Sequence, residues 1–224
     1  MPSDYTFRPL LSENSDFLPE EPLGESVLAD DAASIRVWQP KSRVVVLGRT
    51  QKAEKEIYLK ATQEDSVPVF RRFGGGGCVL LDEHSVCISM RYERVKGLTV
   101  ADYLEHSCMG IADFLASEYD LDCQIGDNYD LILDDRKFLG SSLYMPKGCA
   151  QYSAVMLFDG AAMDGIAKYL TMPSKEPVHR RGRSHEDFLV PLQTYLSDDA
   201  QTFAEKLQDF MEENEWTSRV GDHD

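Results

Sequence analysis

The chain has 224 residues, of which 42% are hydrophobic, and its formal net charge at pH 7 is −16. This length and composition are typical of one globular domain with its own core, so we expect a single domain over residues 1–224. The acidic balance disfavours nucleic acid as a partner, because phosphate binding requires a basic surface. The sequence shows no run of about 20 apolar residues and no secretory signal, so we expect a cytoplasmic protein without membrane contact.

Five cysteines are spread along the chain without a Cys-x-x-Cys pair. An odd number at wide spacing argues against both a disulfide framework and a zinc site. We therefore expect reduced thiols, most of them small core residues. They are Cys78, Cys87, Cys108, Cys123 and Cys149.

The first half of the chain predicts strands followed by one long helix. Pro22 is compatible with the start of a short helix over residues 22–31. Apolar runs predict buried strands over residues 43–48 and 67–72, then a hairpin that pairs residues 79–81 with residues 85–90. The clearest helix covers residues 99–119, capped by Thr99 and Asp102. Its apolar face consists of Val100, Tyr103, Leu104, Ile111, Phe114 and Leu115.

The second half predicts more strands and two shorter helices. A strand over residues 121–125 precedes a hairpin that pairs residues 129–133 with residues 137–144, and residues 152–158 form a buried strand. We expect helices over residues 164–170 and 200–213, with a polar loop over residues 172–186 between them. Two hairpins without regular strand–helix alternation indicate an α/β (α+β) fold, with a mixed, largely antiparallel sheet flanked by helices.

The strongest local signal for a binding site is the segment Arg71-Arg72-Phe73-Gly74-Gly75-Gly76-Gly77-Cys78. Consecutive glycines cost backbone entropy on folding, but they let the backbone approach a ligand closely and direct N–H groups at it. Next to two arginines, such a loop is typical of a phosphate or carboxylate site. The alternative is a flexible turn with two solvated arginines. The spacing matches neither a Walker loop nor a Rossmann fingerprint.

A second candidate segment runs from residue 126 to residue 142. Lys137 follows a tight turn, on a strand that ends in Gly-Ser-Ser, and a lysine held on a strand can stabilise negative charge on a phosphoryl or carbonyl oxygen. Taken alone, Lys137 is better explained as an exposed hairpin lysine. Asn128 and Asp130 are candidates for holding a nucleotide, a metal ion or the lysine, and equally for turn residues.

The most basic stretch of this acidic chain is residues 175–185. It is either a lid that meets phosphates or an acidic protein partner, or a solvated loop whose arginines pair with nearby acids. The residues by themselves leave both interpretations open.

Together, these segments resemble the lipoate–protein ligase A family. The glycine segment is similar to that family's Arg-Arg-x-Ser-Gly-Gly-Gly-Ala signature, and the lysine segment to its Asn-Asp-Leu…Lys-x-x-Gly-Ser-Ala segment. Trp38-Gln39 and the stretch from Val45 to Glu56 also match the family. The resemblance runs in the same order and spacing from about residue 35 to residue 158.

The resemblance implies a mixed-sheet fold and an adenylate-forming reaction. Lipoate or octanoate would react with ATP and Mg²⁺ to an acyl-adenylate, and a lysine of a lipoyl acceptor domain would then take the acyl group. Lys137 would be the catalytic lysine, and Asp130 would help to bind Mg²⁺. The substrate- and nucleotide-binding residues implied are Arg71, Arg72, Gly75, Gly76, Gly77, Asn128, Asp130, Gly140 and Ser141. Some family members also work with a separate small accessory subunit.

Several positions depart from the family pattern. Gly74 replaces its serine, Cys78 its alanine and Leu81 its frequent histidine, while Gln151-Tyr152-Ser153 replaces His-His-Gly. These departures suggest a different acyl preference, or a binder of lipoate or nucleotide that lacks turnover.

A further alternative is an octanoyltransferase of the same superfamily, which takes its acyl group from acyl carrier protein through a cysteine thioester. Cys123 and then Cys149 are its candidate nucleophiles. Biotin ligation is disfavoured, because the expected Gly-Arg-Gly-Arg type of loop is missing.

Overall fold

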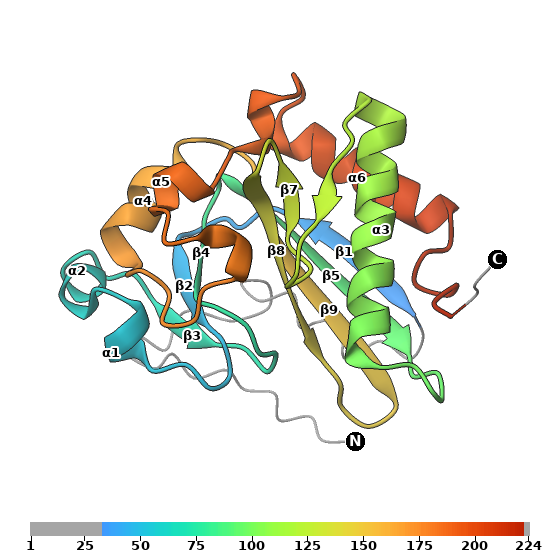
Figure 1. Ribbon diagram of the computed structural model, residues 1–224, viewed down its shortest axis with the longest axis horizontal. Coiled ribbons are helices and arrows are strands. Elements are labelled where there is room, and N and C mark those ends of the chain that lie inside the picture. Colours follow the sequence, from blue (N-terminus) through green and yellow to red (C-terminus); the bar gives the residue numbers. More distant parts are fainter. Residues whose placement is uncertain (1–32, 222–224) are drawn as a thin grey trace.

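The computed structural model describes residues 33–221, which form two β-sheets flanked by helices (Figure 1). The larger sheet has the strand order β1-β5-β9-β8-β7-β6 and the smaller one the order β3-β2-β4. All neighbours are antiparallel except β2 and β3. This confirms the predicted mixed, largely antiparallel architecture, although its strands divide between two sheets.

The strands of the larger sheet are β1 (Ser34–Trp38), β5 (Ser85–Glu93), β6 (Gln124–Ile125), β7 (Leu131–Leu133), β8 (Arg136–Tyr144) and β9 (Cys149–Leu157). Those of the smaller sheet are β2 (Val44–Leu47), β3 (Val69–Arg71) and β4 (Val79–Leu81). The helices are α1 (Ala53–Glu56), α2 (Leu59–Glu64), α3 (Val100–Tyr119), α4 (Ala162–Tyr169), α5 (His185–Phe188) and α6 (Ala200–Glu213).

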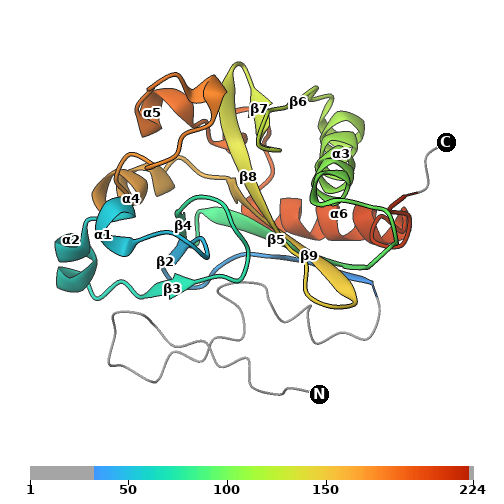
Figure 2. The same cartoon turned by 60° about the horizontal axis from the view of Figure 1, so that its bottom comes forward.

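The main core lies between one face of the larger sheet and helices α3 and α6. Ile88, Tyr152 and Met156 of the sheet are fully buried there, together with Phe114 of α3 and Phe203 of α6. Residues that alternate with these along β5 and β9 point to the opposite face. Figure 2 shows the smaller sheet with α1, α2 and α4 on the other side of the molecule from α3 and α6. The second face of the larger sheet is therefore available for a site.

The first predicted hairpin is wrong. Residues 79–81 form β4, which pairs with β2, whereas β5 pairs with β1 and β9 in the other sheet. The buried carboxylate of Asp82 stabilises the segment in which the chain passes from β4 in one sheet to β5 in the other. It accepts hydrogen bonds from Arg43 Nε at 3.2 Å and from the His84 backbone N–H at 3.1 Å. A turn signal in the sequence marks where the chain reverses, but does not say which strand each arm will pair with.

The second predicted hairpin is confirmed as β7 and β8. Its two turn residues, Asp134 and Asp135, have φ angles of 49° and 59°. Two positive φ angles are the mark of a type I′ turn, whose twist suits a two-residue hairpin. This turn sets the position of Lys137 at the start of β8.

The predicted helices in the described part of the chain are confirmed, with small shifts at their ends. Thr99 and Asp102 form the predicted reciprocal capping box at the start of α3. Val100, predicted on the apolar face, is half-exposed instead. The strand predicted over residues 121–125 is reduced to β6, and the predicted loop over residues 172–186 contains a short 3-10 turn, Val178–Arg180. The helix predicted over residues 22–31 lies outside the described residues.

Within residues 33–221, no helix has both the length and the apolar character needed to cross a membrane.

Thr99→Ala is expected to lower the free energy of unfolding by about 1 kcal/mol, because the N-terminal N–H groups of α3 lose their side-chain acceptor. Denaturant titration followed by circular dichroism measures this change. Thr99→Ser keeps the hydroxyl group and is expected to unfold like the native protein. Equal stability of Thr99→Ala and the native chain would contradict a role for the cap.

Candidate functional site

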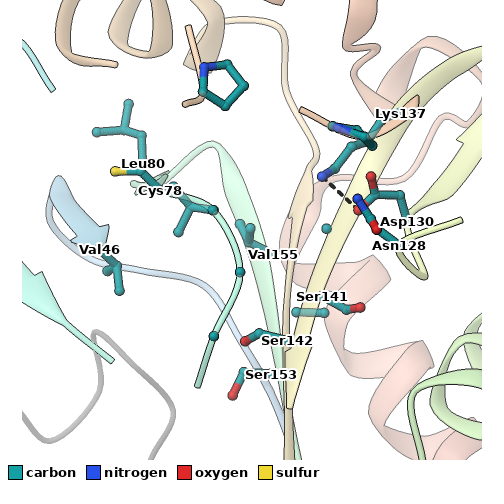
Figure 3. A pocket seen from close by; sticks show the side chains of 18 of the residues that line it. Val46, Cys78, Leu80, Asn128, Asp130, Lys137, Ser141, Ser142, Ser153 and Val155 are labelled. Carbon is teal, nitrogen blue, oxygen red and sulfur yellow. Dashed lines mark ion pairs between the residues drawn. The ribbon is translucent and has the colours of Figure 1, made fainter. Parts of the chain in front are cut away.

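A cavity of about 1020 Å³ lies between the two sheets. One wall comes from β2 and β4 with the glycine-rich segment, and the other from β8 and β9 (Figure 3). Val46, Cys78 and Leu80 lie on the first wall, while Lys137 and Asp130 lie on the second. An apolar region and a charged region thus share one cavity.

Close contact between two glycines brings the glycine-rich segment to this cavity. A Cβ atom on Gly48 would lie 2.2 Å from the carbonyl oxygen of Gly76, so that no side chain fits at position 48. Gly76 itself has a φ of 88°, a conformation that favours glycine. Gly75, Gly76 and Gly77 line the cavity, as the sequence predicted for a ligand loop.

The two arginines of the segment have different surroundings. Arg72 lines the cavity, and its guanidinium donates hydrogen bonds to the carbonyl oxygens of Gly75 and Gly77 at 2.6 and 2.8 Å. Arg71 is not among the lining residues. Its Nη1 donates to the carbonyl oxygens of Gly48, Arg49 and Gln51 at distances of 2.7–3.2 Å, so it braces the loop that follows β2.

Lys137 is held against the cavity wall by Asp130. Its Nζ lies 2.8 Å from Asp130 Oδ1, and the side chains are 25% and 5% exposed (Figure 3). A Cβ atom on Gly140 would lie 2.7 Å from Lys137 Nζ, so glycine at this position leaves room for the ammonium. Because the carboxylate is buried and the lysine is partly exposed, the ammonium of Lys137 can turn from Asp130 toward a ligand in the cavity.

The loop that carries Asp130 has a constrained backbone. Tyr129 has a φ of 57°, and its carbonyl oxygen accepts hydrogen bonds from Ser141 Oγ at 3.0 Å and Cys108 Sγ at 3.3 Å. The predicted binding residue Ser141 therefore uses its hydroxyl to hold this loop, although it also lines the cavity. Asn128 is exposed at the cavity wall beside Asp130.

Residues 172–186, which we call the strap, cover the charged end of the cavity. Arg180 and Arg183 donate to each other's carbonyl oxygens at 2.9 and 3.1 Å, and both guanidinium groups lie over the Phe188 ring. Arg183 also contacts the Asp135 carboxylate at 3.2 Å, which ties the strap to the β7–β8 turn. Arg180 lines the cavity and is only 4% exposed, so this arginine of the basic stretch forms part of the cavity wall.

Two polar cavity residues, Glu56 and His185, also secure the strap. Buried Glu56 accepts hydrogen bonds from the backbone N–H and the hydroxyl of Ser174. His185 Nδ1 accepts from Arg180 Nη2 at 3.3 Å, while its Nε2 donates to the Thr171 carbonyl oxygen at 3.1 Å. Burial, and secondarily the charge of Arg180, lower the pKa of His185 below 6.5, so this histidine is neutral at pH 7.

Sequence reasoning did not find Glu56 as a cavity residue, because it stands in a charged stretch that looks like a solvated helix. It also missed a row of serines, Ser89, Ser153 and Ser142, which lie side by side on β5, β9 and β8 and line the cavity. Three separate strands contribute to this row. Only the strand register brings them together.

The cysteines differ in their access to the cavity. Cys78 lines it, and burial raises the pKa of its thiol to about 12. The two predicted nucleophiles are not among the lining residues, and burial also raises the pKa of Cys123 to about 11. Cys149 is buried at the start of β9. All five cysteines are free thiols.

The residues present do not form a metal-binding cage. Among residues 33–221, no group of three or more His, Cys, Asp or Glu side chains is placed to hold a metal ion. Asp130, the predicted metal ligand, already pairs through Oδ1 with Lys137, and its Oδ2 lies 3.6 Å from His179 Nε2. The side chains around Asp130 therefore do not by themselves provide the ligands for a bound divalent cation.

The sequence matches the family described as "Lipoyl protein ligase A/B catalytic domain" over residues 18–212. It is 30% identical over 204 residues to a protein of Mycoplasma pneumoniae called "Probable lipoate-protein ligase A", covering 91% of this chain and 59% of the relative. A protein of Mycoplasma genitalium with the same name is 29% identical over 162 residues, covering 72% of this chain and 47% of the relative. The chain thus spans less than two thirds of either relative.

The fold is similar to solved structures of the same kind. A lipoate-protein ligase A bound with ATP has a TM-score of 0.72 at 19% identity, covering 85% of this chain and 77% of that chain. A P. falciparum protein in complex with lipoate has a TM-score of 0.66 at 19% identity, covering 83% and 48%. A bi-partite lipoate protein ligase from Thermoplasma acidophilum, described with its E2 lipoyl domain, has a TM-score of 0.69 at 20% identity, covering 82% and 71%.

Gly48→Ala is expected to destabilise the protein by about 1–3 kcal/mol, because the added methyl group overlaps the Gly76 carbonyl group. Thermal unfolding measures the change. Gly75→Ala is the matched control, since a Cβ atom there meets nothing within 4 Å. Equal melting temperatures for the two variants would contradict the close contact between the loops.

The neutral state of His185 predicts a dependence of stability on pH. Because its pKa is lower in the folded than in the unfolded protein, its contribution is complete above about pH 6.5 and is lost as the pH falls toward the folded-state pKa. His185→Gln removes this titration. The free energy of unfolding of the native protein should therefore fall more steeply than that of His185→Gln between about pH 7.5 and 5.5. Parallel curves would contradict the assignment.

Proposed function

Because the chain belongs to the lipoyl protein ligase A/B catalytic-domain family, we propose that it activates lipoate or octanoate with ATP and transfers the acyl group to a lysine of a protein acceptor domain. The observation that carries this proposal is the Lys137 ammonium, held by Asp130 at the wall of a cavity that also has an apolar region. The names of the relatives and the ATP and lipoate in the titles of similar structures support it.

The apolar region of the cavity suits the acyl chain. Val46 and Leu80 on one wall and Val155 on the other surround it, together with Leu157 and Cys78. Each methylene group buried there contributes about 0.8 kcal/mol to binding. The hydrocarbon part of an eight-carbon acid therefore gains binding free energy from burial alone. The serine row lies on the same sheet face as Val155 and offers hydroxyl groups to the polar end of a ligand.

The charged region suits the carboxylate and the phosphates. The backbone of Gly75–Gly77 can approach an anion, and Lys137, Lys175 and Arg180 supply positive charge around the same cavity. Mg²⁺ typically coordinates substrate phosphates and only one or two protein carboxylates, so we propose that it arrives with ATP. Asp130 Oδ1 is already paired with Lys137, so Oδ2 is the oxygen that Asp130 could contribute while it keeps the lysine.

The proposed reaction needs no protein nucleophile. A carboxylate oxygen of the acid attacks the α-phosphorus of ATP and pyrophosphate leaves, which gives an acyl-adenylate. The acceptor lysine then attacks the carbonyl carbon, AMP leaves, and an amide bond remains. In both steps negative charge grows on oxygens near Lys137, whose ammonium stabilises it by charge and hydrogen bonding. The cavity mainly holds the two reactants together in the right orientation.

We propose that the partner of this chain is a lipoyl acceptor domain. A second proposed partner is a separate small accessory subunit. The bi-partite ligase among the similar structures supports this second partner. The free thiols are typical of a reducing compartment such as the cytoplasm.

Lys137→Ala is expected to abolish pyrophosphate release from Mg-ATP with lipoate or octanoate, because the charge that stabilises the transition state is lost. Lys60→Ala is the matched control, since Lys60 is exposed on α2 and is not a lining residue. It is expected to leave the rate unchanged. Pyrophosphate release by Lys137→Ala at the native rate would contradict the proposed role.

Absence of release from the native chain would direct attention to an accessory subunit or to the transferase alternative. Exposure to octanoyl carrier protein followed by mass spectrometry separates these two. A cysteine-bound octanoyl adduct supports the transferase, and an unchanged mass argues against it. Cys78 is the thiol to examine first, because it is the more exposed of the two lining cysteines, Cys78 and Cys87, whereas Cys123 and Cys149 do not line the cavity.

A further inference from the structure

His179, on the strap, faces the carboxylate that holds Lys137. Its Nε2 lies 3.6 Å from Asp130 Oδ2, while Asp130 Oδ1 lies 2.8 Å from Lys137 Nζ. The histidine ring packs against Phe188 with 5.2 Å between the ring centroids. Gly126, at the start of the Asp130 loop, has no side chain, and a Cβ atom there would lie 3.3 Å from His179 Cε1. The ring therefore occupies a fitted place between the strap and the Asp130 loop.

Neither ring nitrogen of His179 makes a hydrogen bond, although both atoms are buried. Burying a polar group without a partner is unfavourable, so this arrangement gains stability when a partner comes within reach. Asp130 Oδ2 is the acceptor that already faces Nε2. A movement of about 0.7 Å would shorten this approach to an ordinary N–H···O distance.

We propose that His179 is a positioning residue that binds Asp130 Oδ2 when the strap tightens over the cavity, and thereby releases Lys137 toward the substrate. The proposal rests on the proposed function, since it concerns the lysine of that reaction. A carboxylate has two oxygens that can accept hydrogen bonds. With one oxygen bound to His179, Asp130 keeps a partner while Lys137 turns away. Without that donor, the buried carboxylate depends on Lys137 alone and holds it more firmly.

Hydrogen bonds and an ion pair of the strap connect His179 to the segment that carries Lys137, so they can transmit this movement. Arg183 donates from Nη2 to the carbonyl oxygen of His179 at 2.9 Å and also contacts Asp135 at the β7–β8 turn. Val190, just beyond the strap, donates its backbone N–H to the carbonyl oxygen of Lys137 at 3.0 Å. The strap, the β7–β8 turn and the backbone of Lys137 are thus joined, and a ligand that draws Arg180 inward also moves His179.

His179→Phe and His179→Gln test this proposal as a pair. Phenylalanine keeps the ring against Phe188 without the donor, and glutamine restores an N–H donor at a similar reach. His179→Phe is expected to lower kcat for pyrophosphate release about ten-fold with little change in KM, as for the loss of one hydrogen bond to a charged group, and His179→Gln to recover most of it. His84→Phe is the control, because it removes the His84–Asp159 pair on the surface, outside the cavity.

Two measurements without turnover separate this proposal from the proposed function. Reaction with an amine-modifying reagent, followed by mass spectrometry, should label Lys137 more slowly in His179→Phe than in the native protein. Trypsin should cut the strap faster in this variant at the exposed Arg181. These results would stand even if the chain released no pyrophosphate. Native rates of both labelling and cleavage in a folded His179→Phe would overturn the proposal.

A measurement on the native protein covers the case in which His179→Phe does not fold. In protein labelled with ¹⁵N-histidine, ATP together with octanoate should shift the Nε2–H resonance of His179 to the position of a proton bonded to a carboxylate. Shifts of other resonances show whether both compounds are bound, and an unchanged His179 resonance in the bound protein would likewise overturn the proposal.

Discussion

The ion pair between Lys137 and Asp130 lies where three parts of the fold meet: the start of β8, the loop that ends in Asp130, and the strap. Lys137 stands at the start of β8, and Asp130 ends a loop with a positive φ at Tyr129. The strap reaches Asp130 through His179, and Val190, just beyond the strap, binds the backbone of Lys137. A buried carboxylate without a cation is strongly unfavourable, so the pair requires all three parts to be in place. The same pair keeps a positive charge at the cavity wall, where a reaction that builds negative charge on oxygen can use it.

The cavity exists because the strands divide between two sheets. The larger sheet buries one face against α3 and α6 and leaves its other face toward the smaller sheet. The contact of Gly48 with Gly76 draws the glycine-rich segment close to β2. The segment then lies opposite β8 and β9, and its backbone becomes part of the wall.

The departures from the family pattern have local physical counterparts in this fold. A Cβ atom on Gly74 would lie 3.2 Å from Ser142 Oγ, so a glycine at position 74 leaves space for the serine side chain on β8. Leu81, in place of the family's frequent histidine, is buried in the cluster that contains Val44 and Phe70 and contributes packing. Ser153, in place of the last residue of His-His-Gly, belongs to the serine row along the cavity. Of these positions, Leu81 and Ser153 line the cavity and Gly74 does not, and the Lys137–Asp130 pair is present.

By itself, the sequence determined most of the local structure and pointed to the two segments that line the candidate site. Apolar periodicity, the capping residues of α3 and the Asp134-Asp135 turn act over a few residues, so their outcome can be predicted from neighbours alone. Tertiary structure decided which strands pair, and so overturned the hairpin of β4 with β5. It also decided that Arg71 braces a loop, that Glu56 and His179 reach the site, and that three serines align. Such contacts join residues far apart in the chain, and their energies depend on burial and strand register, which exist only once the chain has folded.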